Sequence, residues 1–273
     1  MVLSEQGGAY QEYSSALNAK LAGKNIALTF TDAGNLPPDT DLVIAAGMKA
    51  ALSVAQTRPA AMLAVLVPKE GFALLQNDFS QKAKTGANSL SAIYLDQPLK
   101  RQLDLIAAVL PKTGTIGVLY STPPKELGAL RNLAAARTLG LNERSVSSAS
   151  NMHAALQELL ISSDVLLALP DAEIYNASTI RNILLATYRN KVPLIGFSPG
   201  YVKAGALCAV YSTPEQIALQ SLAIIQDYAD KHLLPAAQYA KAFDVSVNEQ
   251  VARSLGINIK SLSQIRSEIG VTP

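Results

Sequence analysis

Short apolar runs rich in β-branched residues alternate along this chain with segments long enough for helices. This alternation constrains the fold most, because strands separated by helices pair in parallel and form a doubly wound α/β sheet. The strands that we expect are 2–3, 26–30, 42–45, 62–67, 116–120, 165–169 and 194–197. The helices that we expect are 10–21, 49–56, 99–110, 126–139, 152–160 and 177–188.

The alternation falls into two series, which predicts two doubly wound parallel-sheet lobes. One series ends near Leu95 and the next begins at Lys112, and 273 residues suffice for two separate cores. Past Val210 we expect a long helix at 214–232, an extended stretch at 242–247 and a capped helix from Asn248. We therefore expect three crossings through hinge strands. The amino-terminal lobe would hold 1–95 plus about 212–241, and the carboxy-terminal lobe 96–211 plus about 242–273.

Composition excludes several classes of partner. Apolar residues make up 49% and charged residues 16%, so the chain should be folded almost throughout. The net charge is +2, with no basic cluster interleaved with aromatics, which disfavours nucleic acid. No apolar run reaches the roughly 18 to 20 residues that span a bilayer.

The cysteine and the histidines do not suggest chemistry. Cys208 is the single cysteine and lies in an apolar stretch, so we expect a small buried side chain rather than a disulfide or a reactive thiol. His153 and His232 lie in sequence predicted to be helical, without partners at metal-ligand spacing. We predict no metal and no cofactor.

The amino end is ambiguous. Residues 1–5 lack the basic and apolar regions of a signal peptide. A methionine placed directly before an apolar strand is also what an exported protein without its signal segment looks like.

In open parallel sheets, ligands bind outside the carboxyl ends of the strands. The residues that follow the expected strands are mostly small or hydroxyl-bearing, with one carboxylate. Such a set can hold a small polar ligand without catalysing a reaction on it. The candidate ligand-binding residues are Ser4, Gly7, Gly8, Gly47, Met48, Pro68, Lys69, Ser121, Asp171, Ser198 and Tyr201.

Residues 196–200, GFSPG, match the G-x-S-x-G nucleophile elbow of serine esterases. The oxyanion hole of such enzymes uses the backbone N–H after the serine, and Pro199 has none. We also expect the Pro199–Gly200 pair to break the helix that should follow. The chain lacks nucleotide-binding glycine motifs, and Asp171 and Glu173 sit where acids favour a helix start.

The stretch from 163 to 220 resembles the ABC transporter substrate-binding protein family, which includes tryptophan- and tyrosine-binding receptors. The motifs are SDVLLALPDAEIYN, YRNKVPLIGFSPGYVKAGALCAVYSTPEQIA and, later, FDVSVNEQVARSLGI. DLVIAAGMKAA and DQPLKRQLDLIAAVLPKTGTIGVLY extend the resemblance more loosely over most of the chain. The resemblance implies a type I periplasmic binding protein fold with the ligand in the cleft between the lobes.

The resemblance also implies roles for single residues. Asp171 would meet a ligand ammonium or hydroxyl group, although it could equally cap a helix for about 1 kcal/mol. Ser121 would be a polar contact or a helix cap, and Gly47 would let a helix end approach the ligand or simply form a tight turn. Ser198 and Tyr201 would lie at the cleft rim, Tyr201 lining the ligand, meeting the other lobe or packing in the core.

One departure concerns the ligand. Aromatic amino acid receptors often carry an acidic–proline pair after the third strand, where this chain has Pro68, Lys69 and Glu70.

We therefore expect a monomeric, extracytoplasmic solute-binding protein, periplasmic or membrane-anchored, that delivers a small polar ligand to an ABC permease without catalysis. The ligand could be an amino acid or a related compound. A ligand-sensing subunit of a membrane receptor would have the same features. A serine esterase at Ser198 is the remaining alternative.

Overall fold

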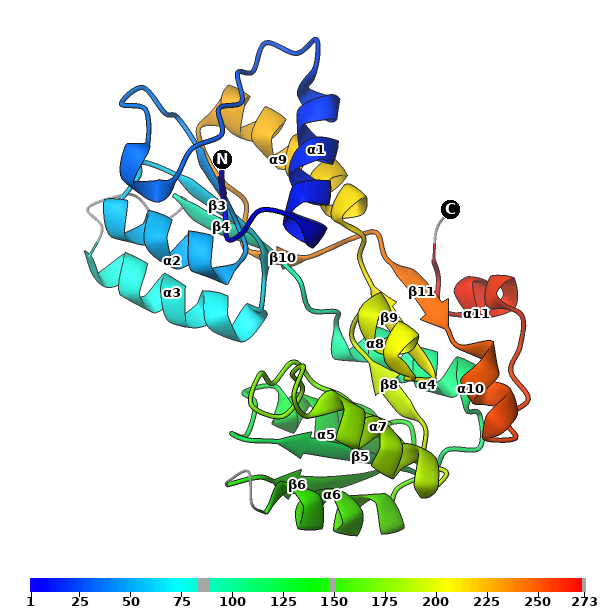
Figure 1. The fold of residues 1–273 in the computed structure, drawn as a ribbon. Helices are drawn as coiled ribbons and strands as arrows, with labels where there is room; N and C mark the ends of the chain where they lie inside the picture. The colour runs from blue at the N-terminus through cyan, green and yellow to red at the C-terminus, as the bar shows by residue number, and fades with distance from the viewer. Residues whose placement is uncertain (83–88, 148–150, 272–273) are drawn as a thin grey trace. The chain divides into compact units, whose positions relative to one another are not determined.

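The computed structural model describes residues 1–82, 89–147 and 151–271, and it divides into two compact units (Figure 1). Unit 1 comprises Met1–Asp96 and Ser212–Phe243. Unit 2 comprises Gln97–Tyr211 and the chain from Asp244 onward. The chain therefore passes between the units three times.

Unit 1 contains a parallel sheet with the strand order β1-β2-β3-β4-β10. Its strands are β1 (Val2–Leu3), β2 (Val43–Ala46), β3 (Met62–Val67), β4 (Leu90–Tyr94) and β10 (Gln238–Tyr239). Its helices are α1 (Gly8–Leu21), α2 (Met48–Thr57), α3 (Lys69–Lys82) and α9 (Pro214–Lys231), with a 3₁₀ turn η1 (Ala33–Asn35).

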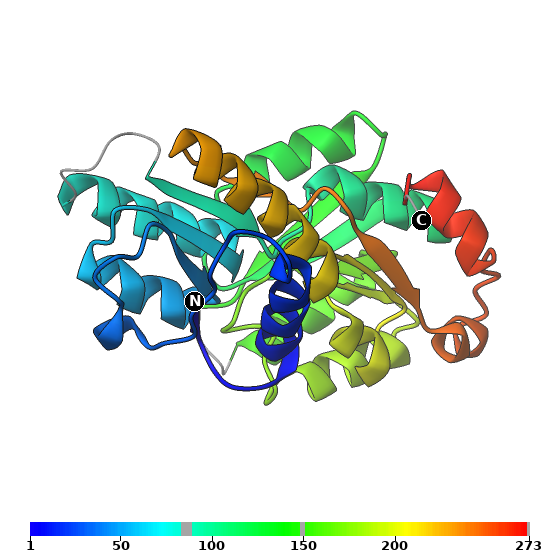
Figure 2. The same cartoon turned by 90° about the horizontal axis from the view of Figure 1, so that it is seen from above.

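Helices cover both faces of this sheet, so every residue of β3 is buried. Leu63 and Val65 pack in one apolar cluster with α1 and α9, whereas Met62 and Ala64 pack in another with α2 and α3. Successive residues of β3 therefore point to opposite faces of the sheet, one covered by α1 and α9 and the other by α2 and α3. α1 and α9 lie side by side (Figures 1 and 2), and the Tyr13 hydroxyl of α1 donates to Ser221 Oγ of α9 at 3.0 Å.

Unit 2 contains a sheet with the strand order β11-β9-β8-β7-β5-β6, parallel except for the antiparallel pair of β11 with β9. Its strands are β5 (Thr115–Tyr120), β6 (Gly140–Ser145), β7 (Val165–Leu167), β8 (Leu194–Gly196), β9 (Cys208–Tyr211) and β11 (Asp244–Val247). Its helices are α4 (Leu99–Val109), α5 (Leu127–Ala135), α6 (Met152–Ile161), α7 (Ile180–Arg189), α8 (Pro199–Ala204), α10 (Glu249–Ser254) and α11 (Leu262–Glu268).

The core of unit 2 joins α6 and α7 to the sheet through Leu159, Leu166 and Ile183. Cys208 in β9 is fully buried, which confirms its prediction as a small core residue, and burial raises the pKa of its thiol. No helix in the described ranges has the length and apolar character needed to cross a bilayer.

The predicted strand at 26–30 is wrong, because this segment joins no ladder of either sheet. It meets the sheet edge at Met1, whose amino group donates to Thr29 O and whose carbonyl accepts from Thr31 N at 3.1 Å. β1 has only two residues, so it offers too short an edge for another strand to pair along. The strands predicted at 165–169 and 194–197 also end early, at Leu167 and Gly196, and the helix predicted at 126–139 ends at Ala135.

Candidate functional site

The carboxyl ends of β1, β2 and β3 place five candidate residues at one edge of the unit 1 sheet. Ser4 follows β1, Gly47 follows β2 as the N-cap of α2, and Pro68 follows β3. Met48 and Lys69 are the first residues of α2 and α3. Because these strands are parallel, the loops that follow them open on the same side of the sheet.

At this edge, Gly47 is the position with the least room for a side chain. A Cβ atom there would lie 2.4 Å from Ser4 Oγ and 2.6 Å from Tyr10 Cε1, and its φ of +89° with ψ of 163° is a conformation that glycine tolerates. The tight-turn interpretation of Gly47 agrees with this geometry, whereas approach of a ligand to Gly47 stays a prediction. The approaching groups are the protein's own Ser4 and Tyr10.

Ser4 caps α2 from a different element, since its Oγ accepts the Ala50 N–H at 2.9 Å. In the described chain, the backbone N–H groups of Met48 and Lys49 have no acceptor. The first N–H groups of any helix lack intrahelical partners. At the start of α2, the N–H groups of Met48 and Lys49 are therefore available as donors, whereas the N–H of Ala50 is bound by Ser4.

Gly7 and Gly8 begin α1 with φ values of +109° and +53°. A Cβ at either position would meet nothing within 4 Å, so the backbone conformation, and not close packing, favours glycine here. Tyr10 was missed by the sequence argument, because it lies inside the α1 pattern and follows no strand directly. Burial and the charge of Glu5 raise the pKa of Tyr10.

Lys69 is held by residues at the ends of β4 and β10. Its backbone N–H donates to Asp96 Oδ2, and its Nζ donates to the Tyr239 hydroxyl at 3.0 Å, 5.0 Å from that ring's centroid. The Tyr239 ring meets the Tyr94 ring edge-on with centroids 5.3 Å apart. Lys69 lies where aromatic amino acid receptors often carry the acidic–proline pair. Its contacts with the Asp96 carboxylate and the Tyr239 ring were not predicted from the sequence.

Just before Pro68, β3 is irregular. Leu66 has a φ of +56°, and the register with β4 shifts between Val65 and Val67. A left-handed non-glycine residue at a bulge re-directs the strand at a cost in backbone energy. This bulge leads the chain into Pro68 and Lys69.

In unit 2, the carboxyl ends of β5 and β7 bring Ser121 and Asp171 into direct contact. Asp171 Oδ2 accepts both the Ser121 N–H at 2.7 Å and the Ser121 hydroxyl at 2.8 Å. Its other oxygen accepts the Glu173 N–H at 3.0 Å and the Ile174 N–H at 3.3 Å. One half-buried carboxylate therefore fastens two loops at the sheet edge.

Asp171 caps a turn rather than a helix. α7 begins later, at Ile180, with Thr179 as its N-cap. The turn that Asp171 caps instead closes with the Tyr175 N–H donating to Asp171 O at 2.7 Å. Ser121 does not serve as the N-cap of α5, which is Glu126. Contact of Asp171 and Ser121 with a ligand stays a prediction.

Beside this pair, β8 runs into an aromatic cluster of Tyr175, Phe197 and Tyr201. The Phe197 ring lies 4.5 Å from the Tyr201 ring and 6.3 Å from the Tyr175 ring, centroid to centroid. The Tyr201 hydroxyl donates to Tyr175 O at 2.8 Å, and a Cβ on Gly196 would lie 2.6 Å from Tyr201 Cβ. Burial raises the pKa of Tyr201, whose ring is half-buried in this cluster.

Ser198 is the N-cap of α8, without a side-chain capping bond. The expectation that Pro199 and Gly200 break the helix is wrong, because α8 starts at Pro199. Proline suits the first helical position, where its missing N–H has no partner to lose. The same missing N–H still removes the oxyanion donor of a nucleophile elbow.

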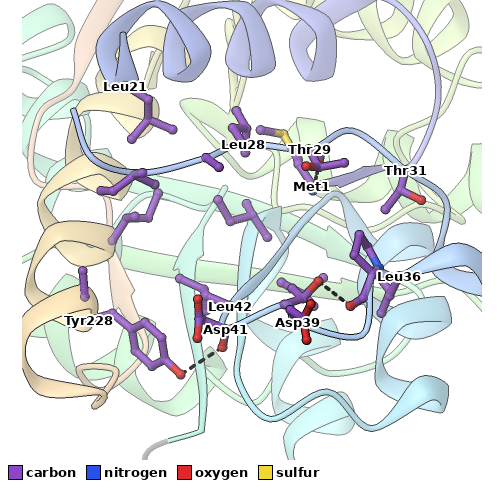
Figure 3. A pocket seen from close by; sticks show the side chains of 18 of the residues that line it. Met1, Leu21, Leu28, Thr29, Thr31, Leu36, Asp39, Asp41, Leu42 and Tyr228 are labelled. Carbon is purple, nitrogen blue, oxygen red and sulfur yellow. Dashed lines mark hydrogen bonds between the residues drawn. The ribbon is translucent and has the colours of Figure 1, made fainter. Parts of the chain in front are cut away.

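A separate pocket of about 390 Å³ lies within unit 1 (Figure 3). Leu28 and Thr29 lie on one side of it and Leu42 on the other, and the Tyr228 hydroxyl donates to Asp41 O at 3.0 Å. It flanks the amino-terminal half of β2, away from the end that carries Gly47, and its lining includes none of the candidate residues. Among the described residues, no three histidine, cysteine, aspartate or glutamate side chains gather to hold a metal ion.

Two doubly wound units, joined by three chain crossings, define a type I periplasmic binding protein fold. The fold class predicted from the sequence is thereby confirmed. A model of the family described as ABC transporter substrate binding protein matches residues 24–266. The chain belongs to this family, as its motifs indicated.

Three relatives illustrate the likeness. The tyrosine-binding protein of Clostridioides difficile (strain R20291) is 27% identical over 205 residues, which cover 68% of this chain and 57% of that protein. The ABC domain in complex with L-Trp from Streptococcus pneumonia has a TM-score of 0.69 at 17% identity, covering 99% of this chain and 98% of its own. The ligand-free, open substrate binding protein with adhesive properties from Clostridium difficile has a TM-score of 0.72 at 19% identity, covering 95% of each chain.

Proposed function

We propose that this protein binds a small polar ligand, an amino acid or a related compound, and delivers it to an ABC importer. Family membership supports a substrate-binding role. The observation that carries the proposal is the contact of Ser121 with Asp171, which places a carboxylate and a hydroxyl at the carboxyl edge of unit 2. The edge of unit 1 offers Ser4 and the open N–H groups of α2.

One ligand held by both edges would act as the link between the units. Binding to both would favour a closed arrangement over an open one by the free energy of the contacts that only the closed form makes. The three chain crossings would absorb the change in backbone dihedrals, as hinge segments do. No group in this proposal alters the ligand chemically.

The comparisons favour an amino acid as the ligand. The relative from Clostridioides difficile is named for tyrosine, and the Streptococcus structure contains L-Trp. Asp171 suits a ligand ammonium group. We further propose that the protein acts outside the cytoplasm as a monomer and that its closed form docks on a membrane permease.

Thermal denaturation with and without ligand tests the proposal. The purified protein is screened against the twenty amino acids, with small carboxylates, nucleosides and sugars as matched classes. A ligand at 100 times its dissociation constant stabilises the protein by about 2.7 kcal/mol, which is several degrees in a chain of this size. A reproducible shift with an amino acid, confirmed by calorimetry, supports the function. Shifts confined to sugars or nucleosides contradict it.

A further inference from the structure

We propose that the pocket of unit 1 in Figure 3 is the seat of one further β-strand segment, formed by apolar residues joined directly to Met1 in a longer form of this chain. The pocket flanks the amino-terminal half of β2, away from the candidate site, so this inference does not depend on the proposed function. It follows from the backbone groups on the two walls of the pocket. The segment 26–30 forms one wall and β2 forms the other.

Met1 already pairs with the segment 26–30 as a residue of a parallel strand does. Its nitrogen donates to Thr29 O, and its carbonyl accepts from Thr31 N at 3.1 Å. A residue that bonds in this way to two residues on either side of its neighbour is the repeating unit of a parallel ladder. On its other side, β1 pairs in parallel with β2. A segment that runs into Met1 would continue both pairings toward its own amino end.

An open backbone donor faces the pocket from each wall. The N–H groups of Val43 and Gly47 donate toward β3, at 2.9 Å and 2.8 Å, so the Ile44 N–H points to the side on which β1 lies. The register of β1 with β2 begins one residue later. On the other wall, the Thr29 carbonyl faces Met1, and in a strand the N–H of the same residue points the same way. Within the described ranges, neither the Ile44 N–H nor the Thr29 N–H has an acceptor.

The two donors are spaced for one incoming strand. Met1 faces the segment 26–30 and Val2 faces β2, and successive residues of a strand alternate between their two neighbours. The residue ahead of Met1 would therefore accept from the Ile44 N–H, and the residue before it would accept from the Thr29 N–H. Ile44 is a buried residue, and a buried N–H without a partner is rare in folded proteins.

The pocket favours apolar side chains on both faces of such a segment. Leu21 and Ile225 line it from the layer of α1 and α9, whereas Leu36 and Val43 line it from the layer of α2 and α3. A strand that is covered on both faces is a continuous apolar run, as β3 is. The wall 25–29 would flank about four residues at the rise of about 3.3 Å per strand residue.

A peptide bond fits the place of the Met1 nitrogen better than a charged group. Burial lowers the pKa of the Met1 amino group, which means that its surroundings disfavour the charge. An amide N–H would keep the bond to Thr29 O without a charge to desolvate. The proposed segment runs parallel to β1, so its carboxyl end lies at this nitrogen. A joined segment also avoids the loss of translational and rotational freedom that a separate peptide would suffer.

Two chains extended at the amino end test the proposal against the protein as it stands. One carries Lys-Val-Ile-Val directly before Met1, and the matched control carries Lys-Val-Pro-Pro, which lacks the last two N–H groups. The first extension should raise the melting temperature of unit 1 by about 4–8 °C. It should also slow amide hydrogen exchange at Ile44 and Thr29 about tenfold or more, because both amides become bonded. The control should do neither.

The exchange rates of these two amides decide the outcome. Slower exchange at Ile44 and Thr29 in the Lys-Val-Ile-Val chain, and not in the control, supports the proposal. Equal rates in the two extended chains overturn it. The free peptide Lys-Val-Ile-Val, added to the unextended protein, distinguishes a joined segment from a second chain. If the free peptide protects both amides and the joined extension does not, the pocket belongs to another chain and the proposal is wrong.

Discussion

Replacing Gly47 with alanine should damage unit 1 more than any other single methyl addition at the candidate site. The new Cβ would lie 2.4 Å from Ser4 Oγ, 2.6 Å from Tyr10 Cε1 and 2.8 Å from Tyr10 Cζ. Overpacking of this kind costs about 1–3 kcal/mol. Holding alanine at a φ of +89° and ψ of 163° costs about 1–3 kcal/mol more.

The sum is a loss of about 2–6 kcal/mol in the free energy of unfolding, or roughly 6–24 °C in the melting temperature of a unit of this size. Differential scanning calorimetry measures it directly, because the two units can unfold in separate transitions. Ligand affinity should fall as well, since Ser4 and Tyr10 must move. A measurement at reduced temperature, where Gly47→Ala is still folded, separates the two effects.

Gly128→Ala is the matched control for Gly47→Ala. Gly128 lies in the first turn of α5, and a Cβ there would meet nothing within 4 Å. Alanine in a helix is favoured over glycine by up to about 1 kcal/mol, so this variant should be neutral or slightly more stable. Equal stability for Gly47→Ala and Gly128→Ala would refute the reasoning from close approach and backbone conformation.

Two further predictions concern unit 2. Asp171→Ala should destabilise it by about 2–3 kcal/mol, because four donors lose a charged acceptor, and should also abolish ligand-induced stabilisation. Asp171→Asn keeps one acceptor oxygen but places an amide group against the other two donors, so it should restore only part of the lost stability. Urea unfolding with calorimetry checks both, and full affinity in Asp171→Ala would exclude the carboxylate from the site. Cys208 should resist thiol reagents until the protein unfolds, since burial raises its pKa. Its contribution to stability is present below the ordinary thiol pKa of about 8.5 and declines as pH rises above it, because the unfolded chain ionises first. Labelling of the native protein at the rate of a free thiol would contradict this.

The parts of the fold that the sequence predicted are those with a strong local signal. β3 is a six-residue apolar run buried on both faces, and its predicted and observed bounds coincide. β6 was not predicted, because Gly140–Ser145 is an edge strand with partly exposed polar residues. The strand expected at 26–30 had the right composition but lacked a partner of sufficient length, and pairing is a tertiary property.

In the candidate site too, local sequence signals were predicted and tertiary contacts were not. Position after a strand was enough to select Ser4, Ser121 and Asp171, which the structure places at sheet edges. It could not reveal that Asp171 binds Ser121, 50 residues away in sequence. Tyr10 and Tyr239 were missed because one lies within a helix and the other in a two-residue strand. Their place at the edge depends on packing between distant segments.

The pairing of α1 with α9 has a consequence for how this protein folds. Tyr13 and Ser221 are separated by 208 residues, yet their hydroxyls bond in the interior of unit 1. All of Gln97–Tyr211 lies in the loop that this contact closes. The entropy of closing a loop rises with its length, and contacts of high sequence separation slow folding. Most strands of unit 2 precede α9 and β10 in the chain, so unit 2 can form most of its sheet while unit 1 is still incomplete. Unit 1 is therefore synthesised first, but its fold is completed late.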